Sequence, residues 1–134
     1  MWDHSRLRNW LVAKTLPLWA DKGRDRRYGG FHEKLDFRQT PIRDDGKRIM
    51  VQARQCCVFA LFAGELPDAP NAAASGFDFM LVHGAHPEGG WRHRVAQDGS
   101  PQDDSRDLYD QAFALFAAAW MHAVFGREDQ MGEV

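Results

Sequence analysis

Apolar residues recur at helical spacing in four parts of the chain. The spacing predicts helices over residues 5–21, 51–64 and 72–83, and a fourth from residue 104 or 105 to about 125. Pro17 lies inside the first range, where we expect it to kink the helix or to end it early. Asp104 or Ser105 is expected to cap the fourth helix, which Gly126 ends.

Short alternating stretches lie between these helices. The segments "FHEKLDF" (31–37) and "KRIMV" (47–51) alternate weakly, and a Pro-Asp-Gly turn sequence, "TPIRDDG", separates them. This pattern predicts a small hairpin in which the two segments pair. The later segment "DGSP" (98–101) is a strong turn signal inside a second loop of the same kind.

The chain contains two copies of one pattern. Residues 29–63 and 89–121 both run Gly-Gly-aromatic, an alternating stretch, a Pro turn, Asp-Asp, a cation, and a helix with a Gln and "FALFA". Gly29 corresponds to Gly89 at a shift of 60, and aligning "FALFA" pairs Phe59 with Phe113 at a shift of 54. We interpret the six-residue difference as small loop deletions between two repeats of one unit.

The repeated unit predicts a fold as well as a period. A helix, a long loop with a small hairpin and a second helix form units that stack side by side, and each needs neighbours to cover its apolar faces. The last helix, "DQAFALFAAAWMHAVF", is apolar on nearly all sides, which predicts complete burial. Little chain follows it, so the pattern indicates an incomplete all-α array of about two helical hairpin repeats.

Composition narrows the functional classes. A length of 134 residues suits one domain, and 44% hydrophobic with 27% charged residues is typical of a soluble protein. The formal net charge of −2 provides no electrostatic footprint for nucleic acid. The longest apolar run, residues 112–121, is too short to cross a membrane, which takes about 20 residues.

The two cysteines are neighbours, Cys56 and Cys57, and this excludes a disulfide framework. Their side chains point about 100° apart on a helix, so joint metal binding is not expected and burial as small apolar groups is. The six histidines show no metal spacing. These features favour a reducing, cytoplasmic location and a chain without a metal site.

The matching segments "VQARQ", "PEGGWRHRV", "DGSP" and "RDLYDQAF" occur in an order and at a spacing that resemble the N-acylglucosamine 2-epimerase family. The resemblance spans nearly the whole chain but only about the first third of the family pattern. It implies an (α/α)6 toroid with the active site in its bowl. Residues 1–134 would then be the N-terminal part of such a domain, completed by missing C-terminal repeats or by a second chain.

The resemblance also implies a reaction. Members of this family are sugar 2-epimerases or mannose-type aldose–ketose isomerases, which open a small-molecule sugar and form a cis-enediol(ate) without a cofactor. The acid and the base are histidines on later inner helices, which this chain lacks, so we expect the isolated chain to be inactive. A non-catalytic helical module that binds a sugar or a protein is the alternative.

Arg54 is the main candidate for catalysis. The family motif that it matches carries an arginine that supports the enediolate, and a guanidinium can donate two parallel hydrogen bonds to such a pair of oxygens. The structural alternative is an arginine at the helix end that pairs with Asp44, Asp45 or Asp110.

Three further residues are candidates for substrate binding. Tyr109 matches a family tyrosine that contacts the sugar, although a tyrosine buried in the core is the alternative. Asp110 is expected to contact the substrate or to orient Arg54. Gln52 has the donors and acceptor to bind a polyol, but its amide is equally suited to bond the backbone of a neighbouring loop.

Overall fold

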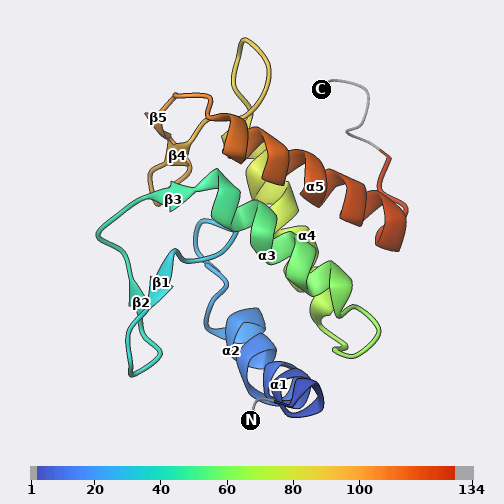
Figure 1. Cartoon of the computed structure of the whole chain (residues 1–134). Helices are drawn as coiled ribbons and strands as arrows, with labels where there is room; N and C mark the ends of the chain where they lie inside the picture. Colours follow the sequence, from blue (N-terminus) through green and yellow to red (C-terminus); the bar gives the residue numbers. More distant parts are fainter. Residues whose placement is uncertain (1–2, 129–134) are drawn as a thin grey trace.

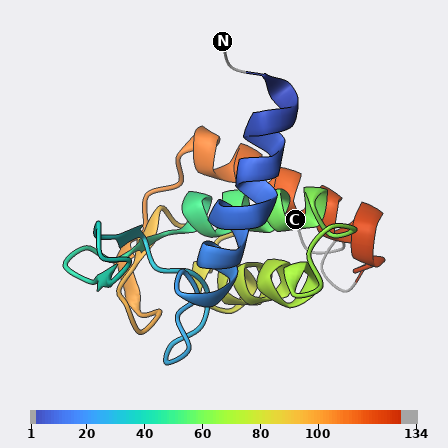
Figure 2. The ribbon, with the colours of Figure 1, turned by 90° about the horizontal axis from the view of Figure 1, so that it is seen from below.

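The computed structural model describes residues 3–128, beginning with a helical stretch of three parts. Helix α1 (His4–Trp10) passes through a one-turn π-helix (Leu11–Thr15) into α2 (Leu16–Asp21). Pro17 lies in the first turn of α2, so the stretch continues past it. At its His4 end this stretch projects beyond the other helices (Figure 2).

The other three helices form the body of the molecule. Helices α3 (Ile49–Leu61) and α5 (Leu108–Phe125) pack side by side, and α4 (Ala69–Phe79) runs back behind them and ends in a π-helical turn, Met80–Gly84 (Figure 1). Within residues 3–128, no helix combines the length and the apolar character needed to cross a bilayer.

The predicted helices exist, but three of their first residues differ from the prediction. Helix α3 begins two residues early, and α4 includes Pro70 in its first turn, where a proline breaks no helical hydrogen bond. The N-cap of α5 is Asp107, whose carboxylate accepts the Tyr109 N–H at 2.7 Å. The prediction of Asp104 or Ser105 as this cap is therefore wrong.

The predicted hairpin partner is also wrong. Strand β1 (Lys34–Leu35) pairs antiparallel with β2 (Pro41–Ile42), because the Asp36 carboxylate accepts two backbone N–H groups and closes a tight local turn. The segment "KRIMV" does not take part in this hairpin. Its strand β3 (Lys47–Arg48) pairs with β4 (Arg94–Val95) of the second unit, and β4 pairs with β5 (Pro101–Asp103).

Each long loop is attached to its helix by one glutamine, which is buried in the first unit and half-buried in the second. Gln52 on α3 donates Nε2–H to the Phe31 carbonyl at 2.9 Å, and its Oε1 accepts the Phe31 N–H at 2.7 Å. Gln111 on α5 makes the same two bonds with Trp91, both at 2.7 Å. We call these two contacts the glutamine clamps.

The clamps correct the alignment of the two units. Gln52 corresponds to Gln111 at a shift of 59, and Ile49 and Leu108, the first residues of α3 and α5, show the same shift. The Gly-Gly turns remain at 60, so the units differ by one residue rather than by six. The pairing of Phe59 with Phe113 is wrong, because the two "FALFA" segments lie at different positions along their helices.

The clamps also explain the paired glycines. Gly30 and Gly90 adopt φ of 68° and 75°, a region that side chains rarely enter. A Cβ at Gly30 would lie 2.6 Å from Gln52 Oε1, and one at Gly90 would lie 2.7 Å from Gln111 Oε1. Only glycine allows the loop to approach the amide this closely.

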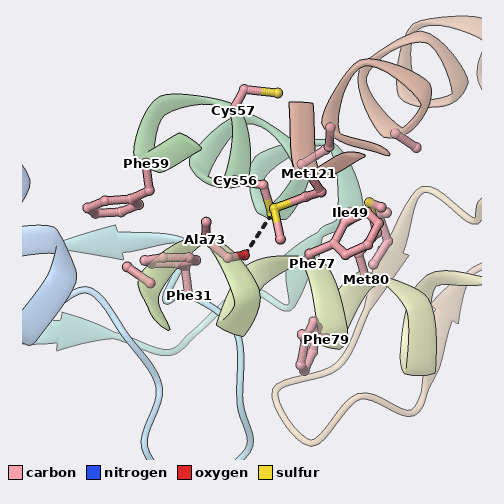
Figure 3. Packing of buried hydrophobic residues seen from close by; sticks show 14 of the residues in the cluster. Phe31, Ile49, Cys56, Cys57, Phe59, Ala73, Phe77, Phe79, Met80 and Met121 are labelled. Carbon is pink, nitrogen blue, oxygen red and sulfur yellow. Dashed lines mark hydrogen bonds between the residues drawn. The ribbon is translucent and has the colours of Figure 1, made fainter. Parts of the chain in front are cut away.

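The core lies between α3, α4, the first loop and the buried side of α5, from which Met121 points inward (Figure 3). Phe31 stacks on Phe59 with ring centroids 5.6 Å apart, and the Cys56 Sγ–H donates to the Ala73 carbonyl at 3.3 Å. Both cysteines are free and buried, as predicted. Burial raises the pKa of the Cys56 thiol well above its ordinary value, so the thiol stays protonated.

A buried ion pair ties the first loop to β3. Lys47, fully buried, donates from Nζ to Asp25 Oδ2 and to the Gly29 carbonyl, both at 2.8 Å, and lies over the Phe79 ring. Burial lowers the pKa of Lys47. Burial alone would raise the pKa of Asp25, but the bonds from Lys47 and from two backbone N–H groups outweigh it and lower that pKa.

The last helix departs from its predicted burial. Only one side of α5 is buried, through Asp110, Ala114, Ala117, Ala118 and Met121. The opposite side leaves Leu108, Leu115, Phe116 and Val124 exposed. In this chain α5 therefore carries an uncovered apolar face.

Replacing Gln52 by Leu should destabilise the protein by about 2–4 kcal/mol, because the buried N–H and carbonyl of Phe31 both lose their partners. Urea denaturation measures this change in the free energy of unfolding. Gln55→Leu, on the same helix, is the matched control and should stay within about 0.5 kcal/mol of wild type. Equal losses in the two variants would show that the clamp contributes nothing.

Replacing Asp25 by Asn should cost about 3–5 kcal/mol at pH 7, because the buried Lys47 loses its counter-charge. Since the Asp25 pKa is lowered by folding, its contribution is complete above the ordinary value of 3.8 and is lost as the pH falls through the lower folded value. The stability difference between variant and wild type should therefore shrink below pH 3.8. A difference that is the same at pH 7 and pH 2.5 would contradict this role; exposed Asp21→Asn is the control.

Candidate functional site

A groove opens between α3 and α5 on the side away from α4. Its walls are almost entirely apolar, and its lining residues are Arg54, Cys57, Val58, Leu61, Phe113, Phe116 and Trp120. Both helices begin at the same end of this groove, beside β3 and β4 (Figure 1). The polar candidates from the sequence are therefore to be sought at that end.

Arg54 lies at the groove and is exposed. Its guanidinium carbon is 5.3 Å from the centroid of the Phe113 ring, a cation–π contact. Within residues 3–128 no carboxylate pairs with Arg54: Asp45 pairs with Lys34, and Asp110 has another partner. The helix-end ion pair, the structural alternative, is not formed.

Tyr109 reaches the same aromatic ring. Its ring meets Phe113 edge to face, with centroids 4.9 Å apart and an interplanar angle of 78°. Tyr109 is 57% exposed, so it is no core residue. Phe113 thus joins Arg54 from the first unit to Tyr109 from the second.

The structure does not support direct substrate contact by Gln52 or Asp110. Gln52 is fully buried and spends both ends of its amide on Phe31, which is the loop-bonding alternative. Asp110 is 1% exposed, and its Oδ2 lies 2.7 Å from Nδ1 of His93. It therefore orients a histidine rather than Arg54.

His93 is the polar residue of this region that sequence reasoning missed. A search for metal spacing passes over it, because its partner lies 17 residues further along on another element. The one signal available was the repeat: in the correct register, His93 and Asp110 replace Glu33 and Val51 of the first unit. The shift of 54 concealed this difference.

The groove offers little other chemistry. Burial raises the pKa of Cys57 to about 11, so its thiol remains protonated at neutral pH and is a poor nucleophile. Across residues 3–128, no three His, Cys, Asp or Glu side chains come together in a way that could hold a metal ion. The chemistry of the described residues centres on Arg54, Tyr109 and the His93–Asp110 pair.

The sequence and the helical fold both match known proteins. The sequence model of the N-acylglucosamine 2-epimerase (GlcNAc 2-epimerase) family matches residues 29–133. The chain belongs to the N-acylglucosamine 2-epimerase family, which confirms the resemblance found in its motifs.

Individual relatives agree with this family. The chain is 40% identical over 136 residues to a mannose-6-phosphate isomerase of Rhizobium meliloti (strain 1021), covering 93% of this chain and 35% of the relative. It superposes on the cellobiose 2-epimerase from Spirochaeta thermophila DSM 6192 with a TM-score of 0.85 at 26% identity, covering 93% of this chain and 31% of that one.

The cellobiose 2-epimerase from Bacillus thermoamylovorans B4167 gives the same TM-score of 0.85 at 25% identity, covering 93% of this chain and 33% of that one. The chain therefore spans about a third of the length of the relatives it matches. Its mostly helical fold with small sheets is that of the corresponding part of these epimerases.

Replacing Arg54 by Ala should change the free energy of unfolding by no more than about 1 kcal/mol, because the residue is exposed and its one aromatic contact is worth little. Urea denaturation of the variant beside wild type tests this. A loss of 3 kcal/mol or more would make Arg54 a structural anchor and remove the reason for placing it in a site.

Proposed function

We propose that this chain is the N-terminal part of a carbohydrate epimerase or isomerase that acts on an opened aldose through a cis-enediol(ate). The observation that carries the proposal is the convergence of Arg54 and Tyr109, one from each unit, on the Phe113 ring at the open groove. Neither side chain is buried, and neither is needed to complete the core.

Arg54 has the chemistry to stabilise the intermediate. Removing the proton beside a sugar carbonyl places negative charge on two neighbouring oxygens. The Arg54 guanidinium lies over the Phe113 ring and has no carboxylate partner among residues 3–128, so its N–H groups are available to donate two parallel hydrogen bonds to such a pair. Donors aimed at developing charge contribute a few kcal/mol in the transition state.

Tyr109 has the chemistry to position the sugar. Its ring is held edge to face by Phe113, so the phenol group has a fixed direction, and its hydroxyl can both donate to and accept from a sugar hydroxyl. The named activities of the relatives, 2-epimerisation of cellobiose and isomerisation of mannose 6-phosphate, both rearrange a sugar next to its carbonyl carbon. This common chemistry supports a substrate of the aldose class.

The site is completed by further units of the same repeat, so that residues 1–134 form part of an (α/α)6 toroid. Strand β3 of the first unit pairs with β4 of the second, and the equivalent residues Arg106 and Asp107 have no such strand among residues 3–128. The uncovered apolar face of α5 supports the same conclusion. A longer chain or a second polypeptide supplies these units and, with them, the acid and the base that act at the carbon beside the carbonyl.

The test uses a chimaera in which this chain replaces the matching third of its 40%-identical relative. In heavy water, the chimaera should introduce deuterium at C2 of mannose or a related aldose, followed by NMR. Arg54→Lys should lower kcat about 100-fold, because lysine keeps the charge but loses the paired donors. Arg38→Lys, in the exposed first hairpin, is the matched control and should match the unsubstituted chimaera.

Wild-type turnover in the Arg54→Lys chimaera would remove Arg54 from the mechanism. The parent relative should be active in the same assay. If the chimaera then binds the sugar but takes up no deuterium, the non-catalytic binding module is favoured.

A further inference from the structure

A second pair of polar side chains lies at the end of the groove where α3 and α5 begin. The Asp110 carboxylate, whose side chain is 2% exposed, holds Nδ1 of His93 at 2.7 Å, while the His93 side chain is 31% exposed. One nitrogen of the imidazole is therefore held by a buried carboxylate, while about a third of the side chain is exposed.

The pair lies at the same end of α3 and α5 as the proposed sugar site. The Ile49 N–H, at the start of α3, donates to the His93 carbonyl at 3.1 Å, and Arg54 follows five residues later, about 7.5 Å along the helix axis. Asp110 directly follows Tyr109 in the first turn of α5. The imidazole, the guanidinium and the phenol thus all come from the end at which α3 and α5 begin.

The fold does not require this pair. In the first unit the equivalent of Asp110 is Val51, so an apolar residue fills the same helix position. The equivalent of His93 is Glu33, which bonds Arg48 instead. Burying a carboxylate costs free energy unless it is hydrogen-bonded, and Asp110 is bonded to the imidazole. The position of Asp110 therefore serves His93.

A carboxylate that accepts a hydrogen bond from Nδ1–H leaves Nε2 with its lone pair, the form of histidine that takes up a proton. We propose that His93, positioned by Asp110, opens the ring of an aldose, and that this chain by itself catalyses the interconversion of α and β anomers. The choice of an aldose rests on the proposed function, but the step needs no residue outside the described chain.

Nε2 takes the proton of the anomeric hydroxyl, the C1–O5 bond breaks, and C1 becomes a carbonyl carbon. O5 leaves with the electron pair of that bond and takes a proton from water. The imidazolium then returns its proton to the hydroxide that this water leaves. Closure of the ring on either face of the carbonyl is the reverse sequence and gives both anomers.

The first test is the tautomer of His93 in the full 134-residue chain, read from two-dimensional ¹⁵N NMR of the imidazole. Wild type should carry its proton on Nδ1. Asp110→Asn should lose this preference, because an amide can also donate to the ring. An Nε2–H tautomer in wild type would overturn the proposal.

The second test is the rate of anomer interconversion of mannose, measured by NMR exchange spectroscopy with the isolated chain. Wild type should accelerate it above the buffer rate. His93→Asn should lower the catalysed rate about 100-fold, because asparagine can keep an N–H toward Asp110 but has no basic nitrogen in place of Nε2. His4→Asn, an exposed histidine on α1, controls for catalysis by any imidazole.

An unchanged rate in His93→Asn, or a wild-type rate no higher than buffer, would overturn the proposal. A purely structural role predicts the first of these results, since this variant can keep the bond to Asp110. The proposed function fails on a different signal, deuterium uptake at C2 of the sugar. The isolated chain could accelerate anomer interconversion while the chimaera takes up no deuterium. That result would support ring opening by His93 and contradict the enediolate reaction.

Discussion

Two glutamine side chains, one on each of two helices, determine the arrangement of this molecule. Gln52 and Gln111 each satisfy the N–H and the carbonyl of a single loop residue, so a long loop is fixed to the first turns of a helix. Phe31 and Trp91 are thereby buried rather than exposed. With the loops fixed, β3 meets β4 and the two units join, which brings α3 and α5 together along the groove.

The clamps account for what the sequence could and could not predict. Helical periodicity located the helices, since it reports burial along one element. The strand partner of "KRIMV" and the register of the two units depend on contacts between elements, which periodicity does not record. Gln52 shows the same limit, because its amide can bond a polyol as well as a loop backbone. Only its burial in the structure favours the loop backbone.

The two units share a scaffold and differ where they face the groove. In the clamp register, Phe113 occupies the position equivalent to Arg54, so the cation of one unit packs on the ring of the other. Arg54 and Tyr109 came from motif resemblance, and the structure brings them to one ring. The His93–Asp110 pair was hidden, because finding it requires the correct register. In that register, Arg54, His93 and Asp110 all occupy positions at which the two units differ.

The claim that the clamps hold the loops to the helices is tested most directly by amide hydrogen exchange. The N–H groups of Phe31 and Trp91 belong to loops, where exchange is ordinarily fast, but each is bonded to the amide oxygen of a clamp glutamine. The account predicts that both exchange as slowly as the central amides of α3. Exchange at the rate of the exposed turn around Arg38 would contradict it, and with it the register on which the site is built.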